Sequence, residues 1–299
     1  MLLKNLSRDK FLLLMILPVV VYYIVFHYVP MSGIVIAFKN FTVSKGIWGS
    51  DWVGVKWFEQ FFNSIFFWRL LRNTLLISVY GLLFGFWVPI AFALLLSELK
   101  NGYFKRFAQT VSYLPHFVSI VVVVGMMVMF LSPTNGVVNL LLNHLGLSSI
   151  AFFDDSAWFR TLYVGSDIWQ SFGWNSIIYL AAIAGINTQL YEAAKCDGAN
   201  RWRQIWHITL PGIRPTIMIL LILSIGNMMN VGFEKILLMY NPGTYEVSDV
   251  ISTYVYRRGI LAADYSYGAA VGLFNSAVNF ILLIAVNQTS RKMNQASLW

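Results

Sequence analysis

Two asparagines in a strongly apolar segment are the first residues of this sequence whose chemistry requires an explanation. Asn227 and Asn230 lie three residues apart, in a segment otherwise rich in Ile, Leu and Met. On a helix this spacing places both amides on one face, where each can donate and accept hydrogen bonds. Polar groups are costly within a membrane and usually face a bundle interior or a water-filled path. The pair therefore indicates either a path that binds hydroxyl groups or hydrogen bonding between helices.

A second apolar segment combines aromatic and amide side chains. Aromatic faces suit the apolar faces of ring-shaped solutes, and neighbouring amides suit their hydroxyl groups. Trp and Tyr also populate both interfaces of membrane proteins, and we interpret Trp169 as such an anchor. The residues predicted to line a substrate path are Asn227, Asn230, Trp174, Tyr179, Gln170 and Asn175.

Residues for covalent or metal chemistry are scarce. The single cysteine, Cys196, has no His or Asp arrangement that would make it a nucleophile. No metal-ligand spacing is found among the four histidines, which are His27, His116, His144 and His207. A GxxxxGK[ST] loop is absent, as is an HExxH or Ser/His constellation. We therefore predict no catalytic residue, no metal site and no cofactor bound by this chain.

A polar stretch at residues 191–215 separates two apolar segments. Good helix formers precede Gly198, which can supply the left-handed conformation that ends a helix. Asn200 is a good N-cap for a second helix over 201–209, and Pro211 is expected to stop that helix. The stretch predicts a helix-turn-helix unit between two membrane spans.

Composition places these segments in a membrane. The 299 residues are 58% hydrophobic and only 11% charged, whereas a soluble domain carries about a quarter charged residues. We predict an all-α polytopic membrane protein with six transmembrane helices, the first bent near Pro30, and a helix over Lys56–Leu71 lying in the interface. The predicted spans are Phe11–Phe38, Asn73–Ser97, Phe107–Leu131, Leu162–Ile186, Pro215–Val231 and Tyr267–Asn287.

The distribution of charge predicts the topology. If both termini are cytoplasmic, the inner segments hold 12 basic residues, which include Lys4, Arg8 and Lys10, and 4 acidic residues, which include Asp9. These segments then carry the whole net charge of +8, as the positive-inside rule expects. Membrane topology thus explains the basic balance without nucleic-acid binding, and it makes the stretch at 191–215 cytoplasmic.

The polar stretch at 191–215 resembles the cytoplasmic EAA loop of ATP-binding-cassette (ABC) importer permeases. The matching positions are Glu192, Ala193, Ala194, Gly198, Ile208, Leu210 and Pro211. The chain is similar to the carbohydrate-uptake, maltose-permease-like group. The segments FHYVPMSGIVIAFKNF, TYVYRRGI and YSYGAAVGLFNSAVN resemble the lipoprotein-associated permeases that transport oligosaccharides. In maltose-type permeases an Asn-x-x-Asn pair at a similar distance after the loop contributes to the sugar site, which matches Asn227 and Asn230.

The resemblance implies a transmembrane subunit that works by alternating access. Its partners would be a second homologous permease, two ATPase subunits that bind ATP and Mg, an extracellular solute-binding lipoprotein and an oligosaccharide. The residues implied to couple the chain to the ATPase are Glu192, Ala193, Ala194, Asp197, Gly198, Arg201, Ile208, Leu210 and Pro211.

We expect three regions along the chain. Residues 1–69 hold the first transmembrane helix and an extracytoplasmic loop, residues 70–290 the permease domain with its EAA loop at 188–214, and residues 291–299 a cytoplasmic tail. Other readings remain: a permease for a non-sugar solute, a secondary transporter or an intramembrane enzyme. The last two are disfavoured because the spans lack the paired ionisable residues of an ion relay or a catalytic site.

Overall fold

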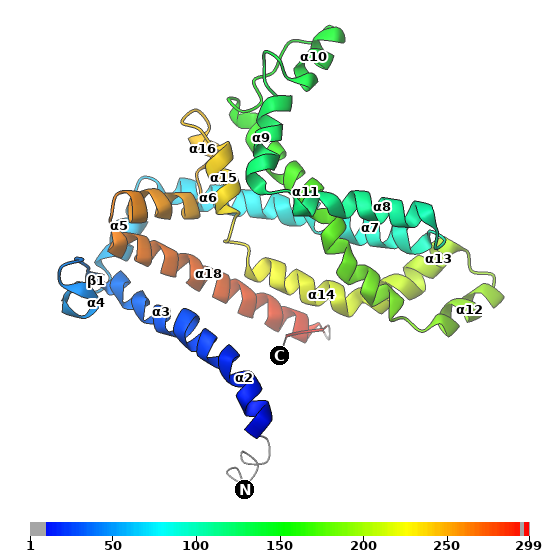
Figure 1. Cartoon of the computed structure of the whole chain (residues 1–299), viewed down its shortest axis with the longest axis horizontal. Helices are drawn as coiled ribbons and strands as arrows, with labels where there is room; N and C mark the ends of the chain where they lie inside the picture. Colours follow the sequence, from blue (N-terminus) through cyan, green and yellow to red (C-terminus); the bar gives the residue numbers. More distant parts are fainter. Residues whose placement is uncertain (1–9, 294–295, 299) are drawn as a thin grey trace. The chain divides into compact units, whose positions relative to one another are not determined.

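The computed structural model describes residues 10–293 and 296–298. Lys4, Arg8 and Asp9 of the charge argument therefore lie outside the described residues, as does part of the predicted tail. Nearly all regular elements of the described part are helices (Figure 1). The strands are β1 (Lys39–Asn40) and β2 (Asp51–Trp52), which pair antiparallel with Lys39 opposite Trp52. The prediction of a mostly helical chain is confirmed.

The chain forms two compact units, which we describe separately. The first comprises residues 1–64 and 255–274. Its elements are α2 (Lys10–Tyr23), the π-helix η1 (Ile24–Tyr28), α3 (Val29–Met31), the 3₁₀-helix η2 (Ser32–Phe38), β1, α4 (Gly46–Gly49), β2, α5 (Lys56–Phe62), the π-helix η6 (Tyr256–Leu261) and the start of α18 (Tyr265–Lys292). Side chains along 11–31 are exposed and apolar, as expected of a helix that faces lipid.

Hydrogen bonds and aromatic rings hold the first unit together. The indole nitrogen of Trp57 donates to the carbonyl oxygen of Lys39 at 2.9 Å, and the amide of Phe41 donates to Ser266 Oγ at 2.9 Å. The buried ring of Phe61 meets that of Phe274 edge to face at 5.4 Å. The hairpin is thus attached to the start of α18.

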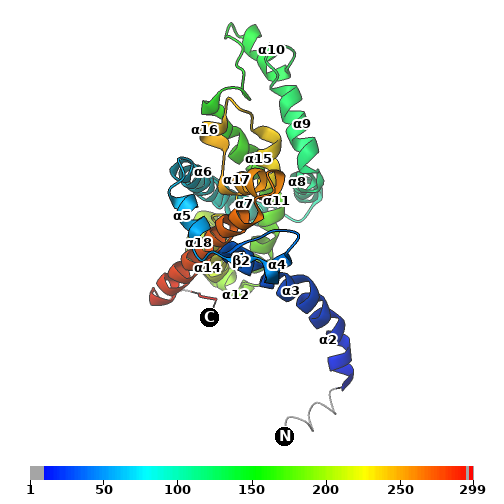
Figure 2. The same cartoon turned by 90° about the vertical axis from the view of Figure 1, so that its left-hand side faces the viewer.

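The second unit comprises residues 65–254 and 275–299. Its elements are α6 (Phe67–Tyr80), the π-helix η3 (Gly81–Gly85), α7 (Trp87–Glu98), α8 (Tyr103–Tyr113), the 3₁₀-helix η4 (Leu114–Phe117), α9 (Ile120–Phe130), α10 (Val137–His144), α11 (Ser156–Ala184), α12 (Thr188–Cys196), α13 (Arg201–Gln204), the π-helix η5 (Ile205–Thr209), α14 (Leu210–Gly226), α15 (Phe233–Met239), α16 (Tyr245–Ser248), most of α17 (Ile251–Val255) and the end of α18. In Figures 1 and 2, α10 and α12 lie at opposite ends of this unit.

The long helix α11 is the axis of the second unit. Near its start, Phe159, Tyr163 and Val164 pack in one buried cluster with residues of α6, α9 and α15. Near its end, Tyr179 packs with Ile90 of α7 and Ile213 of α14. Gly173 lies so close to the backbone of Ser112 that a Cβ there would collide with it, which explains a glycine in mid-helix. Because α11 contacts so many helices, it fixes their positions around the site.

Four helices are long and apolar enough to cross a membrane, and a bent pair can supply a fifth. The four are Phe11–Phe38, Phe67–Glu98, Arg201–Gly226 and Tyr265–Lys292. Helix α11 covers the predicted fourth span but is not among these candidate spans. It is long enough to cross a membrane, but Arg160, Asp167 and several amide and hydroxyl groups lower its mean hydropathy. The described chain is therefore a helical membrane protein with four or five candidate spans.

Two predicted helices differ in the structure. The third predicted span, Phe107–Leu131, is divided into Tyr103–Phe117 and Ile120–Phe130, which meet at 99°. Pro115 and the extended residue Val118 break the helix, and Ser119 caps the next one through Val122. The helix expected over Lys56–Leu71 is also two helices, since α5 ends at Phe62 and α6 starts at Phe67.

Candidate functional site: a polar pocket and an exposed helix-turn-helix

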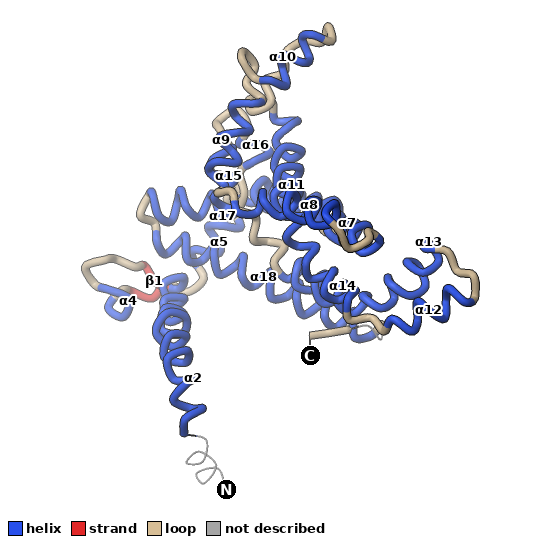
Figure 3. Tube along the Cα trace, turned by 45° about the vertical axis from the view of Figure 1, so that its right-hand side comes forward, coloured by secondary structure: helices blue, strands red, loops and turns tan. Residues whose placement is uncertain are grey.

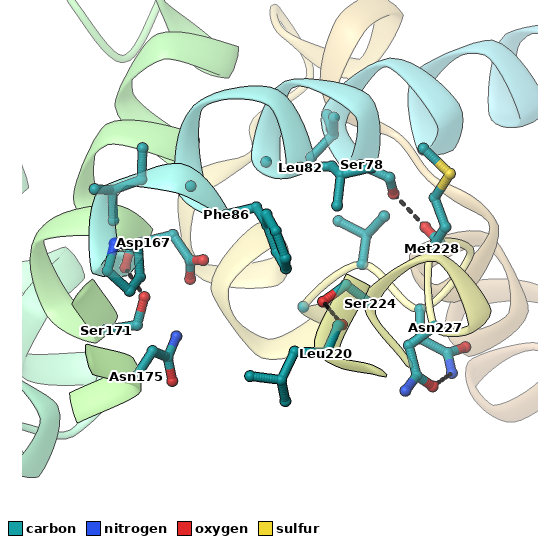
Figure 4. Close-up of a pocket in the computed structure, with 18 of the residues that line it drawn as sticks. Ser78, Leu82, Phe86, Asp167, Ser171, Asn175, Leu220, Ser224, Asn227 and Met228 are labelled. Atoms are coloured by element: carbon teal, nitrogen blue, oxygen red, sulfur yellow. Dashed lines mark hydrogen bonds between the residues drawn. The ribbon is translucent and has the colours of Figure 1, made fainter. Parts of the chain in front are cut away.

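A pocket of about 470 Å³ lies within the second unit, between α6 with η3, α11 and α14 (Figure 4). Its polar lining comes from three separate parts of the sequence. The polar and ionisable residues that line it are Ser78, Tyr163, Asp167, Ser171, Asn175, Tyr179, Ser224, Asn227 and Asn230. Four of the predicted path residues, Asn175, Tyr179, Asn227 and Asn230, thus surround one cavity.

Asn227 and Asn230 do not share a helical face as predicted. Helix α14 ends at Gly226, not at Val231, and Asn227 is its C-cap, so the two asparagines lie in the turn that follows. Gly and Asn favour such helix ends. The amides still meet, because Asn230 Nδ2 donates to Asn227 Oδ1 at 3.4 Å and Asn275 Nδ2 donates to Asn230 Oδ1 at 3.0 Å.

The irregular backbone at 227–232 is held by side chains. Ser78 Oγ donates to the carbonyl oxygen of Met228, Met229 donates its N–H to Asn279 Oδ1 at 2.9 Å, and Gly232 donates to the hydroxyl of Tyr163 at 3.0 Å. Within a membrane, non-helical backbone is tolerated only where it is buried in protein or lines a water-filled cavity. The turn at 227–232 is held by side chains of the protein and also lines the pocket, so it forms part of the pocket wall.

Asp167 and Lys235 form an ion pair at the edge of the pocket. Lys235 Nζ lies 3.5 Å from Asp167 Oδ1 and donates to the carbonyl oxygen of Tyr163 at 2.9 Å. The lysine side chain is 4% exposed, whereas that of Asp167 is 61% exposed and faces the cavity. Burial lowers the pKa of Lys235, and the Asp167 carboxylate opposes that shift.

Asp167, which lies near the start of the predicted span Leu162–Ile186, was not among the residues predicted to line a path. A signal was available: Asp167, Ser171 and Asn175 are spaced four residues apart and so lie on one face of a helix. The structure places all three along the pocket side of α11.

Trp174 and Gln170 lie outside this pocket. The Trp174 ring stacks on His116 with ring centres 4.5 Å apart, and Gln170 Nε2 donates to the carbonyl oxygen of Val118 at 2.8 Å. Both side chains therefore support the break between α8 and α9. Trp169 lines a different, apolar cavity of about 470 Å³ between α9 and α11.

The predicted helix-turn-helix is present as α12 and α13 with a short loop between them (Figure 3). Gly198 has φ of 74°, the predicted left-handed conformation. The amides of Gly198 and Ala199 donate to the carbonyl oxygens of Lys195 and Ala194, which is the Schellman pattern that ends a helix. Asn200 Oδ1 accepts from the amide of Arg203 at 2.9 Å, so its predicted capping role is confirmed.

The predicted helix end at Pro211 is wrong. Helix α13 continues through η5 into α14, so Arg201–Gly226 is one helical segment. Proline removes one backbone donor and crowds the preceding turn of a helix. The wide π-turn at Ile205–Thr209 lies directly before Leu210 and Pro211 and accommodates both effects, as such turns often do. The loop is therefore joined by continuous helix to the span that leads to Asn227.

The coupling residues predicted in the loop fall into exposed and packed sets. No residue of α12 is buried, and Glu192 and Ala193 are exposed, whereas Ile208 and Leu210 are partly buried. Tyr191 and Thr209 join the two helices through their hydroxyl groups at 3.0 Å. Arg201 Nη1 lies 3.8 Å from Glu98 Oε2, which connects the loop to the end of α7.

Comparison with known proteins places this architecture in one family. Residues 81–295 match the family described as binding-protein-dependent transport system inner membrane component. The chain is 46% identical to Protein LplB of Bacillus subtilis, over 98% of this chain and 92% of that protein. It is 45% identical to the polygalacturonan/rhamnogalacturonan transport system permease protein YteP of the same organism, over 100% and 93%.

Solved structures agree over the whole chain. A bacterial alginate ABC transporter in complex with an alginate pentasaccharide-bound periplasmic protein contains a chain that matches with a TM-score of 0.91 and 43% identity. The match covers 99% of both chains. A second structure, of a bacterial ABC transporter involved in import of the acidic polysaccharide alginate, matches with a TM-score of 0.91 and 44% identity, over 98% of this chain and 99% of that chain.

This family consists of transport components and not of enzymes, as predicted for a chain without catalytic residues. The apolar helices and the family match make the chain a multi-pass membrane protein. The pocket with its irregular wall and the projecting helix-turn-helix suit a transport component. The chain belongs to the family of inner membrane components of binding-protein-dependent transport systems, and resembles the carbohydrate ABC permeases within it.

Proposed function

We propose that this chain is one transmembrane subunit of an ABC importer that moves an oligosaccharide into the cytoplasm by alternating access. One observation carries the proposal: an exposed helix-turn-helix is continuous, through Arg201–Gly226, with the turn that lines the polar pocket. In this proposal a displacement of the loop is transmitted to Asn227 and Asn230 through this continuous helix. The sequence contains no GxxxxGK[ST] loop, and in this proposal the work comes from ATPase partners that bind ATP and Mg.

The pocket supports a hydroxyl-rich solute. Its polar lining consists mainly of amides and hydroxyl groups, which pair with sugar hydroxyls as donors and acceptors. YteP is named as a permease of a polygalacturonan/rhamnogalacturonan transport system, and the two matched structures are of alginate transporters. We extend the carbohydrate class to this chain, with Asn175, Tyr179, Asn227 and Asn230 as contacts on its side of the path. Trp174 and Gln170 act instead by shaping the helix break beside it.

The loop is proposed to dock on an ATPase subunit. Glu192, Ala193 and Ala194 lie on the exposed first helix, Asp197 and Gly198 form the turn, and Arg201 joins the loop to α7. Ile208, Leu210 and Pro211 connect the loop to the span. When the ATPase dimer closes, the docked loop moves and carries α14 with it.

The proposed topology has six spans, with α11 as the fourth and the bent pair α8–α9 as the third. A helix as polar as α11 is compatible with a membrane because it lies among other helices and faces a cavity. Both termini and the loop at 188–214 then lie in the cytoplasm. In this scheme residues 1–69 hold the first span and an outer loop, 70–290 the permease domain and 291–299 the tail. A second permease completes the path, and a binding lipoprotein delivers the sugar.

The proposal is tested by reconstitution. The chain is co-purified with its partner permease, ATPase and binding protein, and ATPase activity is measured in proteoliposomes. We expect a loaded binding protein to stimulate ATP hydrolysis and to drive uptake of labelled oligosaccharide. Glu192→Lys should abolish stimulation because it replaces the one acidic side chain of the docking helix with a basic one. Uptake that persists without the ATPase subunits would favour a secondary transporter instead.

A further inference from the structure

Two arginines beyond the pocket form no ion pair with an acidic residue of the described part of the chain. Arg72 lies on α6 and Arg160 on α11, both near the helix ends farthest from the α12–α13 loop. Arg160 precedes the pocket residue Asp167 by seven positions, or about 10 Å along the helix. Neither arginine lines the pocket, but Arg160 precedes the lining residue Tyr163 by one helical turn and Arg72 precedes the lining residue Ile77 on α6. Both arginines therefore lie beyond the end of the pocket that is extracytoplasmic in the proposed topology, which we call the mouth of the pocket.

The contacts of these arginines leave their charge uncompensated. Arg160 Nη2 donates to Asn73 Oδ1 at 3.3 Å, but its Nε is buried without a partner. Arg72 is exposed, and its positive charge repels the positive charge of Arg160. Neither forms an ion pair within the described part of the chain.

A neighbouring arginine provides the contrast. Arg69 Nε is also buried without a hydrogen-bond partner, but Arg69 Nη2 lies 3.3 Å from the buried carboxylate of Asp249, so this cation has an acidic partner. Asn73 Nδ2 donates to the carbonyl oxygens of Asp249 and Glu246, which brings the segment at 246–249 against the same site. The Asp249 carboxylate already forms an ion pair with Arg69, and the exposed Glu246 forms no ion pair among the described residues. Two like charges without an anion are costly where water is partly excluded, which indicates that a ligand supplies the anion.

We propose that Arg160, assisted by Arg72, binds the carboxylate of an acidic oligosaccharide at the mouth of the pocket. A guanidinium group binds a carboxylate through two parallel N–H···O bonds, and this geometry favours it over a lysine. Farther in, no Lys or Arg of the described residues lines the cavity, and the Asp167 carboxylate forms an ion pair with Lys235. The carboxylate therefore stays at the mouth while the sugar hydroxyls meet Asn175 and Asn227.

This inference rests on the proposed function and names its substrate class. Its test uses the complete transporter with its binding protein in proteoliposomes. The probes are a labelled uronate tetrasaccharide and the same tetrasaccharide with its carboxyl groups chemically reduced to alcohols. The reduced probe keeps the chain length and the ring hydroxyls, so the ratio of the two kcat/KM values isolates the contribution of the carboxylates.

We expect Arg160→Gln to lower the ratio of kcat/KM for the acidic over the reduced probe about tenfold, a typical effect of losing a charge-assisted contact. Arg72→Gln should lower it less, and Arg160→Lys should restore part of it. Arg69→Gln is the matched control, because this paired arginine should affect both probes equally through folding.

Three outcomes contradict the proposal. Equal losses for both probes in Arg160→Gln would assign that arginine a structural role only. Import of the reduced probe alone by the unaltered transporter would overturn the acidic substrate class while leaving the oligosaccharide importer intact. Import of neither probe, with no stimulation of ATPase activity by any loaded binding protein, would overturn the proposed function as well.

Discussion

Asn230 lies between two other amides and so shapes the polar side of the pocket. Its Nδ2 donates to Asn227, and its Oδ1 accepts from Asn275. Such a chain of amides orients donors and acceptors before a ligand arrives, which lowers the entropic cost of binding. The sequence identified these asparagines from polarity alone. It could not indicate that they lie in a turn, because the end of α14 depends on tertiary bonds from Ser78 and Asn279.

Asn230→Leu should weaken transport with little loss of assembly. Each net hydrogen bond contributes about 1 kcal/mol, so we expect uptake at limiting substrate to fall roughly fivefold. The measurement is initial uptake rate against substrate concentration in proteoliposomes. Asn143→Leu, an exposed asparagine of α10 away from the pocket, is the control and should leave uptake unchanged. Equal uptake in both variants would remove Asn230 from the path.

The ion pair of Asp167 and Lys235 predicts an asymmetric response. Asp167→Asn leaves a buried ammonium group without its counter-charge, whereas Lys235→Met leaves a carboxylate that is 61% exposed to the cavity. We therefore expect Asp167→Asn to lower the melting temperature of the purified complex more than Lys235→Met does. The double variant should recover most of the loss. A larger fall in melting temperature for Lys235→Met than for Asp167→Asn would contradict this argument, because it would mean that water does not stabilise the unpaired Asp167 carboxylate.

At the scale of elements, the sequence predicted the turn between α12 and α13, but it did not predict that the helix after this turn continues without a break from Arg201 to Gly226. Gly198 and Asn200 act through their own backbone preferences, which the sequence states directly. Pro211 was misread because a π-turn upstream removes the conflict that a proline normally causes in a helix. Likewise α11 is polar for a span, and only its packing between other helices makes a position in the membrane reasonable.

Gly198→Ala should disturb the loop without affecting the rest of the unit. A Cβ meets no atom within 4 Å there, so the cost arises from the backbone conformation, about 1 kcal/mol for a residue forced to positive φ. We expect weaker ATPase binding and reduced stimulation by the binding protein, measured by co-purification and ATPase assay. Gly125→Ala, which also has open space but no positive φ, serves as control. Normal coupling in Gly198→Ala would show that the loop tolerates a different turn.

At the scale of the molecule, topology determines what each surface can do. In the proposed topology the pocket mouth with Arg160 faces the binding protein, and α12 faces the ATPase. These assignments follow from the positive-inside distribution and from the opposite placement of the two features along α11. Family resemblance adds the partners, but it does not replace a measurement of which side each surface occupies.

The chain carries a natural probe for that measurement. Cys196 is the single cysteine of the sequence, and it is exposed at the end of α12. A maleimide that cannot cross membranes should label it in inside-out vesicles and not in right-side-out vesicles. Bound ATPase subunits should slow the labelling, because they cover the docking helix. Labelling is followed by mass change of the intact subunit.

A second cysteine position makes the experiment internally controlled. In a Cys196→Ser background, Ser149→Cys places a thiol in the exposed loop between α10 and α11, at the opposite end of the second unit. It should react only from the outside, and the ATPase subunits should not affect its rate. If Cys196 reacts from the outside instead, the proposed topology is inverted, and α12 cannot be the surface on which an ATPase acts.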